Sequence, residues 1–386
     1  MPENPIPVIE PGGMIGILGG GQLGRMTAMA ARTLGYNVHI LDPDANCAAG
    51  AVADRVVAAR FDDADAASEL ARHCDVVTLE IEQISPAAMD AVARHAPLRP
   101  SKAIVEVIQD RARQKRWLSD NGLPLGAYRE VNTPDDLAAA FDALGPLFVK
   151  ARHGGYDGRS QARVEARTDV PAAWEALAGR GAVAEQALDL ELELSVMVAR
   201  RPSGETKVFP PALNVHERQI LAWSVLPAPL PSAITAQAIE LARRIGDAFA
   251  LEGILAVEMF LTTDGALLVN ELAPRPHNSF HETEIACSTS QFEQLVRAVC
   301  DLPLGSTDAL RPGAIYNLFG DVWLASNGTP RFEVALAQPG IRLHLYGKPG
   351  ARPGRKMGHL SAVGETPDDA LARVRAAAAA ITATED

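Results

Sequence analysis

The N-terminal part of the chain alternates between short apolar runs and alanine-rich stretches of helical length. The apolar runs cover residues 14–18, 36–42 and 75–81, and alanine-rich stretches at 22–34 and 64–73 separate them. Strands that alternate with helices in this way form β-α-β units, and the strands of such units lie parallel. The pattern therefore predicts α/β structure here, a Rossmann-like parallel sheet flanked by helices.

The pattern changes further along the chain. A proline-rich connection followed by a basic helix interrupts the alternation near residue 110. From residue 146 apolar strands are broken by glycine turns, with helices expected at 171–178 and 233–250, which is typical of α+β structure. An alanine-rich helix at 368–382 closes the sequence. We expect a disordered extension over residues 1–13 and domains over 14–110, 111–310 and 311–386, the last of them small and mainly β.

Length and composition exclude several classes of protein. A chain of 386 residues, 47% hydrophobic and 22% charged, has room for two or three domains. Its apolar runs are far shorter than the roughly 18 residues of a membrane-spanning helix. The N-terminal sequence MPENPIPVIEPGG lacks the basic and apolar parts of a secretory signal. We therefore expect a cytoplasmic protein without a membrane partner. A net charge of −12 argues against nucleic acid as a partner.

The sequence GILGGGQLG contains Gly19, Gly21 and Gly24 directly after the first expected strand. This Gly-x-Gly-x-x-Gly spacing is typical of dinucleotide-binding turns, in which a pyrophosphate lies at a helix N-terminus. Asp42 ends the second expected strand, 21 residues after Gly21, where such proteins place an acid for the ribose. By itself the motif predicts an NAD-dependent oxidoreductase.

An acidic pair in the second half of the chain points to a different chemistry. Asp264-Gly265 lies between two apolar runs, which predicts a hairpin with a two-residue turn. In that register Glu258 lies directly opposite Glu271, where two like charges destabilise the strand pair unless a cation offsets them. Carboxylate oxygens suit Mg²⁺, and Asn270 offers a further oxygen. The alternative is an exposed acidic pair without a metal.

Further residues are suited to binding phosphate. Lys150 ends a strand and precedes the glycine-rich segment ARHGGYDGRSQ, so an ammonium group and backbone N–H groups lie together. The segment is not a Walker A loop, and an ordinary hairpin turn is the alternative. Arg111 and Lys115 add cations on a helix. Lys348 and Arg355, with Arg352 and Lys356 beside them, form a basic cluster suited to a phosphate monoester, or alternatively an ordinary solvated turn.

Five segments in order resemble the ATP-grasp superfamily, and within it the family of 5-(carboxyamino)imidazole ribonucleotide synthetases. They are GILGGGQLGRM, VKARHGGYDGRSQ, ELELSVMVAR, VNELAPRPHNS and GKPGARPGRKMGH. The resemblance runs from about residue 14 to the end. It implies a pre-ATP-grasp domain, a central ATP-grasp domain and a small C-terminal domain, with ATP and Mg²⁺ as cofactors. It also implies a homodimer.

The resemblance assigns residues to each ligand. It implies Glu258 and Glu271 as metal ligands, and Lys150, Asp157 and Arg275 as catalytic residues. For ATP it implies Arg111, Lys150, Gly155, Tyr156, Asp157, Gly158, Arg159, Ser160, Glu185, Gln186, Ala187, Leu188, Glu193, His216, Asn270 and Glu271. For aminoimidazole ribonucleotide it implies Gln22, Glu80, Tyr156, Asp157, Arg159, Arg275, His277, Asn278, Lys348 and Arg355.

The implied reaction is the ATP-dependent carboxylation of aminoimidazole ribonucleotide with bicarbonate, through carboxyphosphate, in purine biosynthesis. This chain departs from the family pattern at Ala273, where an Asn is usual, at Ser160, where a Gly is usual, and in the segment TLEIEQI. The alternatives are a formate-dependent glycinamide ribonucleotide transformylase, the oxidoreductase above, and a catalytically silent nucleotide-binding regulator. In the favoured interpretation the glycine turn and its helix N-terminus border the ribonucleotide instead of binding NAD.

Overall fold

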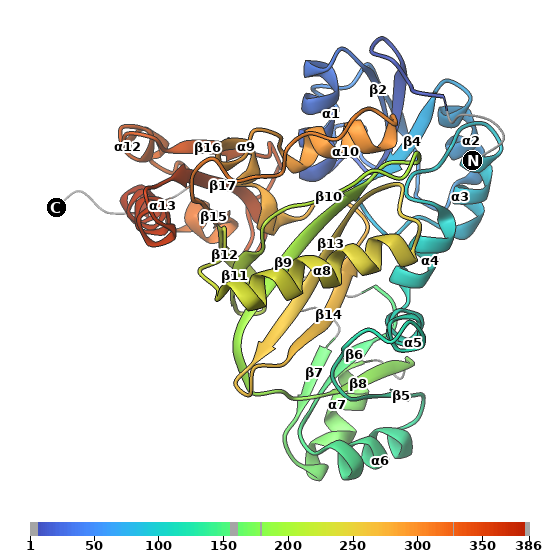
Figure 1. The fold of residues 1–386 in the computed structure, drawn as a ribbon, viewed down its shortest axis with the longest axis vertical. Coiled ribbons are helices and arrows are strands. Elements are labelled where there is room, and N and C mark those ends of the chain that lie inside the picture. Colours follow the sequence, from blue (N-terminus) through green and yellow to red (C-terminus); the bar gives the residue numbers. More distant parts are fainter. Residues whose placement is uncertain (1–6, 155–160, 178–179, 327, 383–386) are drawn as a thin grey trace.

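A computed structural model of the chain describes residues 7–154, 161–177, 180–326 and 328–382. Figure 1 shows three sheets: a parallel sheet near the N-terminus, a small sheet (β5 to β8) at the opposite end, and a long central sheet that runs between them and continues to the C-terminal helices. Within the described residues no helix is long and apolar enough to cross a membrane.

The N-terminal sheet is parallel, as predicted, with strand order β3-β2-β1-β4. Its central strands are buried because helices cover both faces, and Ile15, Ile17, Val38 and Ile40 are fully enclosed. The short edge strand β3 was not predicted. The elements are β1 (Met14–Leu18), α1 (Gln22–Thr33), β2 (Asn37–Asp42), β3 (Arg55–Ala58), α2 (Ala64–Ala71), β4 (Val76–Leu79), α3 (Pro86–Ala93) and α4 (Lys102–Gln109).

The small sheet is antiparallel and has the order β5-β8-β6-β7. Helix α6 begins with a capping box, in which the Thr133 hydroxyl accepts from the backbone of Asp136 and the Asp136 carboxylate accepts from the backbone of Thr133. The elements are α5 (Arg111–Asp120), β5 (Tyr128–Val131), α6 (Pro134–Leu144), β6 (Leu147–Ala151), β7 (Gln161–Val164), η1 (Arg167–Asp169), α7 (Val170–Ala176) and β8 (Ala182–Gln186).

The central sheet contains nine strands within the described residues. Its order is β14-β13-β9-β11-β12-β15-β17-β16, with β10 paired to β9. Strands of the predicted central and C-terminal domains therefore share one sheet, joined where β12 pairs with β15. The strands are β9 (Leu190–Arg200), β10 (Thr206–Val208), β11 (Ala212–Glu217), β12 (Ile220–Leu226), β13 (Gly253–Thr262), β14 (Leu267–Ala273), β15 (Gly313–Phe319), β16 (Arg342–Leu345) and β17 (Lys356–Val363).

Helices cover the central sheet at both ends. Helix α8 packs on β9, with Ala238, Leu241 and Ile245 in a buried cluster. Helix α13 packs on β15 and β17, and α10 lies against α1 of the N-terminal part (Figure 1). The remaining elements are α8 (Ser232–Ala248), η2 (Asn278–Phe280), α9 (Thr283–Ala286), α10 (Gln291–Val299), α11 (Gly320–Ala325), α12 (Phe332–Leu336) and α13 (Pro367–Thr382).

The hairpin that carries the acidic pair differs from the prediction in its turn. Leu261 pairs with Leu267 and the Thr262 amide donates to the Ala266 carbonyl oxygen, so the loop has three residues rather than two. The third, Gly265, has φ +85°, a value that glycine adopts without strain. A bulge between Glu258 and Met259 then shifts the register by one residue. Glu258 therefore lies opposite Glu271 as predicted, although the predicted turn was wrong.

The segment before β1 is ordered from at least Ile9. The Ile9 amide donates to the Cys300 carbonyl oxygen at 2.9 Å, and its own carbonyl accepts from the Tyr36 hydroxyl at 2.6 Å. Gly12 donates to Gly35. The disordered extension predicted over residues 1–13 is therefore wrong for this part, because its backbone groups find partners in the folded body.

Candidate active site

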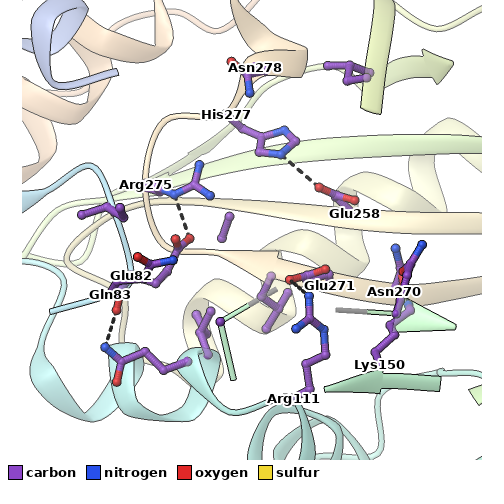
Figure 2. A pocket seen from close by; sticks show the side chains of 18 of the residues that line it. Glu82, Gln83, Arg111, Lys150, Glu258, Asn270, Glu271, Arg275, His277 and Asn278 are labelled. Atoms are coloured by element: carbon purple, nitrogen blue, oxygen red, sulfur yellow. Dashed lines mark hydrogen bonds and ion pairs between the residues drawn. The ribbon is translucent and has the colours of Figure 1, made fainter. Parts of the chain in front are cut away.

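A cleft of about 1290 Å³ opens where the three sheets meet, and side chains from all three parts of the chain line it. Figure 2 shows its central region, with Lys150 and Arg111 on one side and His277 on the other. The predicted site residues that line it are Gln22, Glu80, Arg111, Lys150, Glu185, Gln186, Leu188, Glu193, His216, Glu258, Asn270, Glu271, Arg275, His277, Asn278, Lys348 and Arg355.

One predicted residue within the described part of the chain does not line the cleft, and six others lie outside the described part. Ala187 is that described residue. Its backbone amide donates to the Pro146 carbonyl oxygen, and its side chain is a methyl group too short to extend into the cleft. Residues Gly155, Tyr156, Asp157, Gly158, Arg159 and Ser160 lie outside the described residues, so their assigned roles stay predictions.

A buried carboxylate between two lysines marks the end of the cleft beside the small sheet. Glu185 on β8 lies 2.9 Å from Lys115 Nζ and 3.2 Å from Lys150 Nζ. Burial alone would raise the pKa of Glu185, but the two ammonium groups lower it to about 2. Lys115 also donates to the Asn270 carbonyl oxygen at 3.1 Å. Lys115 was noted in the sequence only as a cation on a helix, and its burial on α5 could not be read from that.

The acidic pair, Glu258 and Glu271, lies near the centre of the cleft, and each carboxylate has a nearby cationic or imidazole partner. Arg111 Nη2 lies 3.3 Å from Glu271, and His277 Nε2 lies 3.0 Å from Glu258 (Figure 2). Burial would raise the pKa of Glu258, yet the hydrogen bond with His277, together with nearby positive groups, lowers it to about 2. Asn270 accepts from Lys150 Nζ at 3.3 Å. Oxygen donors from Glu258, Asn270 and Glu271 therefore line one cleft.

Glu193 and His216 lie together on the neighbouring strands β9 and β11. His216 Nδ1 is 3.0 Å from a Glu193 carboxylate oxygen. Burial would lower the pKa of His216, but the contact with Glu193 outweighs it, so the pKa is raised. The two residues that the sequence assigned separately to the nucleotide thus form one ion pair.

The predicted ribonucleotide residues gather at the opposite end of the cleft. Gln22 Nε2 donates to Asn278 Oδ1 at 3.2 Å, and Lys348 Nζ donates to Gln22 Oε1. Lys348 also lies 5.3 Å from the centre of the Tyr346 ring. Arg355 donates to the Gly350 carbonyl oxygen at 2.8 Å. Residues from the N-terminal, central and C-terminal parts are therefore in direct contact here.

One polar partner in the cleft was missed in the sequence. Glu82 lies 2.7 Å from Arg275 Nε (Figure 2). It follows Glu80 by two residues just beyond β4, and that spacing is the signal that would have indicated a second carboxylate on the same side.

The glycine turn binds a protein carboxylate rather than a dinucleotide. Glu80 accepts from the backbone amides of Gly21 at 2.6 Å and Gly24 at 2.9 Å. Asp42, the candidate ribose ligand of an oxidoreductase, accepts from the Gly20 amide at 2.7 Å. A pyrophosphate would compete with one carboxylate and be repelled by both. Gly21 and Gln22 nevertheless line the cleft, so the use of this turn as an edge of the ribonucleotide site stays a prediction.

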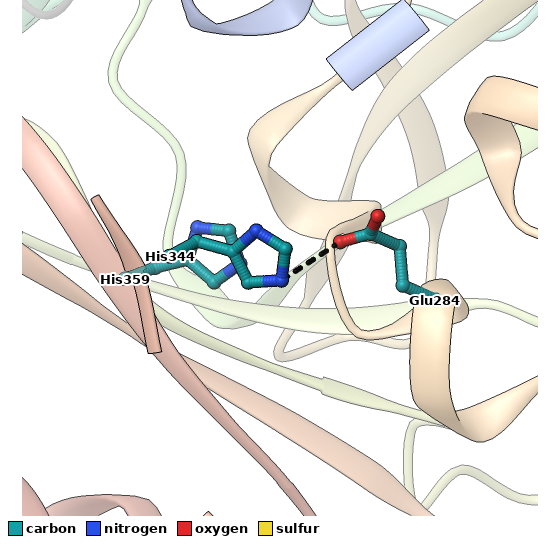
Figure 3. Close-up of side chains that lie close together, drawn as sticks. All are labelled: Glu284, His344 and His359. Carbon is teal, nitrogen blue, oxygen red and sulfur yellow. Dashed lines mark ion pairs between the residues drawn. The ribbon is translucent and has the colours of Figure 1, made fainter. Parts of the chain in front are cut away.

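A second cluster of possible metal ligands lies outside the cleft. Glu284, His344 and His359 offer ligand atoms within 4.8 Å of one another, and Glu284 pairs with His344 (Figure 3). The two imidazole rings stack with 4.6 Å between centroids and an angle of 9° between planes. A metal must lie in the plane of each ring that binds it, so parallel stacked rings do not suit one ion. We assign this cluster to packing.

Three family models match consecutive parts of the chain. The ribonucleotide synthetase preATP-grasp domain matches residues 13–109, the ATP-grasp domain matches 116–292, and the phosphoribosylaminoimidazole carboxylase C-terminal domain matches 313–373. The N5-carboxyaminoimidazole ribonucleotide synthase of Bacillus subtilis (strain 168) is 40% identical over 364 residues, covering 94% of this chain and 94% of that protein. The chain belongs to the N5-carboxyaminoimidazole ribonucleotide synthase family.

Solved structures of the same family are also similar to this chain. A crystal structure of an ADP complex of an N5-carboxyaminoimidazole ribonucleotide synthetase has a TM-score of 0.91 and 40% identity, covering 96% of this chain and 98% of that one. The synthase of Aspergillus clavatus in complex with ADP and 5-aminoimidazole ribonucleotide has a TM-score of 0.88 and 35% identity, covering 96% and 98%. The predicted family, fold class and enzyme class, an ATP-grasp ligase that forms a carbon–nitrogen bond, are confirmed.

Proposed function

We propose that this protein uses ATP to carboxylate the exocyclic amine of 5-aminoimidazole ribonucleotide with bicarbonate, giving N5-carboxyaminoimidazole ribonucleotide, ADP and phosphate in purine biosynthesis. The proposal is based on one observation: three parts of the chain line a single cleft. This cleft has residues suited to a nucleotide at one end, the acidic pair near its centre and basic residues at the other end. Family membership, and the complex of the Aspergillus clavatus relative with ADP and aminoimidazole ribonucleotide, support the same substrates.

The nucleotide lies, in this proposal, between the small sheet and the central sheet. Glu185 would face the adenine amino group, while Lys150 and Arg111 are close enough to the acidic pair to reach the phosphates beside it. We also propose that the acidic pair and Asn270 hold Mg²⁺, because the donor set consists of oxygens alone, which this ion prefers. The ion would offset the phosphate charge.

The chemistry starts with attack of a bicarbonate oxygen on the γ-phosphorus of ATP, which releases ADP and forms carboxyphosphate. Carboxyphosphate breaks down to CO₂ and phosphate, the amine nitrogen bonds to the CO₂ carbon, and that nitrogen loses a proton. Positioning and charge neutralisation by Lys150 and Arg275 are the main contributions of the protein. Asp157 remains the candidate for accepting the proton. Lys348 and Arg355 would hold the ribonucleotide phosphate.

ADP release separates this reaction from its nearest alternative. We expect release that requires both bicarbonate and aminoimidazole ribonucleotide, measured by a coupled assay. Release that instead requires formate and glycinamide ribonucleotide would refute the proposed substrates. Glu271→Gln should abolish turnover, whereas Glu191→Gln, an exposed strand residue outside the cleft lining, should leave it unchanged.

We further propose that two copies of the chain form a homodimer, as the family resemblance implies. Sedimentation equilibrium at micromolar concentration should give twice the 41.0 kDa mass of one chain. A mass of one chain across the whole concentration range would contradict the dimer.

A further inference from the structure

A row of polar side chains leads from the cleft into the interior of the central sheet. His277 Nδ1 lies 2.8 Å from Ser279 Oγ, and Ser279 Oγ lies 2.7 Å from Ser195 Oγ. Asn214 Nδ2 donates to Ser195 Oγ at 3.0 Å. The register explains the row, because Ser195 on β9 lies opposite Glu258 on β13. The row therefore begins directly beside the acidic pair.

The row ends on a carboxyl group without charge. Ser224 on β12 is the register partner of Asn214. Its Oγ lies 3.0 Å from the Ser279 carbonyl oxygen, 3.2 Å from Asn214 Oδ1 and 3.2 Å from Glu282 Oε1. Glu282 is fully enclosed. Burial raises the pKa of Glu282 to about 8, so this carboxyl is neutral at pH 7 and carries a proton that it can donate.

The direction of the hydrogen bonds follows from the chemistry of each group. An amide nitrogen only donates, so Ser195 Oγ accepts from Asn214 and its own hydrogen is left for Ser279. Ser279 then uses its hydrogen on His277 Nδ1, which must accept. The ring proton is therefore on Nε2, the nitrogen that faces Glu258 at 3.0 Å. The hydrogens of Asn214, Ser195 and Ser279 along the row therefore all point toward the cleft.

We propose that the row formed by Glu282, Ser224, Asn214, Ser195 and Ser279 fixes His277 as the Nε2–H tautomer. In that form the ring donates to Glu258 and holds its carboxylate in the orientation that the nucleotide and metal require. His277 is then a positioning residue that acts through Glu258, as outer partners of metal ligands do. Its effect on turnover rests on the proposed function, whereas the tautomer itself does not.

The test reverses the direction of the hydrogen bonds along the row with one isosteric substitution. Asn214→Asp replaces the donating nitrogen by an oxygen that only accepts once the carboxyl is ionised. At a pH where it is ionised, Ser195 and Ser279 must turn their hydrogens inward and His277 Nδ1 must donate. Nitrogen-15 NMR of the full-length, metal-free protein reports the proton on each ring nitrogen, and His277→Gln assigns the signal among the nine histidines. We expect an unprotonated Nδ1 in the wild type and a protonated Nδ1 in Asn214→Asp.

Two controls separate this effect from damage to the fold. Asn317→Asp on β15 also places a carboxyl at a buried asparagine, whose amide donates to the Leu221 carbonyl oxygen, but outside the row. It should cost stability without changing the His277 signal. Glu282→Gln offers Ser224 an uncharged partner of the same size and should retain the wild-type signal, which would show that the row needs no charge at this position.

Turnover gives the second readout. Asn214→Asp should raise the Mg²⁺ concentration for half-maximal ADP release at least about 10-fold, the usual effect of losing an outer partner of a metal ligand. Asn317→Asp should not. A protonated Nδ1 in the wild type would overturn the proposed tautomer. So would a signal in Asn214→Asp that stays unchanged up to the highest pH at which the protein remains folded. Absence of ADP release from the wild type would instead contradict the proposed function and leave the NMR result standing.

Discussion

Glu185→Gln tests how much the Glu185 carboxylate, which lies between Lys115 and Lys150, contributes to the stability of the folded protein. The glutamine side chain has the same size and still accepts a hydrogen bond, but it carries no charge for Lys115 and Lys150. Both ammonium groups would then lie close together with no carboxylate between them. The substitution therefore removes an electrostatic interaction while leaving the packing nearly unchanged.

The structure gives the expected size of the loss. The pKa of Glu185 falls from its ordinary 4.5 to about 2, and the linkage between pKa and stability turns this difference into about 3 kcal/mol at pH 7. Removing one partner from a buried ion pair costs about 3 to 5 kcal/mol in other proteins. Two independent routes therefore agree on a loss of about 3 kcal/mol in the free energy of unfolding.

The pH dependence has a definite sign. Because the pKa of Glu185 is lower in the folded protein, its contribution is complete above about pH 4.5, the ordinary value, and declines as the pH falls toward 2. The difference between wild type and Glu185→Gln should shrink over the same interval. Near neutral pH it should stay constant.

Urea unfolding followed by far-ultraviolet circular dichroism measures the loss, and a double-mutant cycle attributes it. The four proteins are the wild type, Glu185→Gln, Lys115→Met and the double variant. We expect the second substitution to cost at least about 1 kcal/mol less once the first is present, because the pair is already broken. A loss below about 0.5 kcal/mol in Glu185→Gln, or two fully additive losses, would refute the importance of this ion pair.

Three further predictions concern other parts of the cleft. Lys348→Ala should raise the KM for aminoimidazole ribonucleotide about 10- to 100-fold, because one charge-assisted contact is lost. The same change at the exposed Lys207 on β10 should leave the KM unchanged. An unchanged KM in Lys348→Ala would argue against the phosphate site. Gly24→Ala should lower the free energy of unfolding by about 1 to 3 kcal/mol, because a Cβ there would lie 2.5 Å from the Gly19 carbonyl oxygen; equal urea midpoints would contradict this. Removal of divalent metal with EDTA should stop ADP release but leave the urea midpoint unchanged, since each carboxylate of the acidic pair already has a protein partner; a large loss of stability would show that those partners are insufficient.

Much of the architecture follows from local patterns in the sequence. The parallel N-terminal sheet was predictable because its strands are apolar on both faces and its helices separate them regularly. The chain position of α8 was predictable from its apolar face, which packs on β9. The register of the acidic pair agreed with the prediction only because the three-residue loop and the bulge offset each other. In each case the elements involved are close in sequence.

Contacts between distant segments were not predictable in the same way. The pair of Arg275 with Glu82 and the pairs of Glu185 with Lys115 and Lys150 depend on how three sheets are placed around one cleft. A sequence shows that these charges exist but not which ones meet. The glycine turn is the sharpest example, because its spacing predicts a dinucleotide. Only the folded chain shows that Glu80, 59 residues after Gly21, fills the helix N-terminus.

The bulge in β14 explains how two adjacent residues serve one cleft. In a regular strand neighbouring side chains point to opposite faces, so Asn270 and Glu271 could not both face the nucleotide. The register shift leaves Asn270 as the extra residue, since Glu271 pairs with Glu258 and Val269 pairs with Met259. Bulges re-aim side chains in this way and are common beside active sites. Here the irregularity brings an amide oxygen and a carboxylate to the same side, where Lys150 and Arg111 contact them.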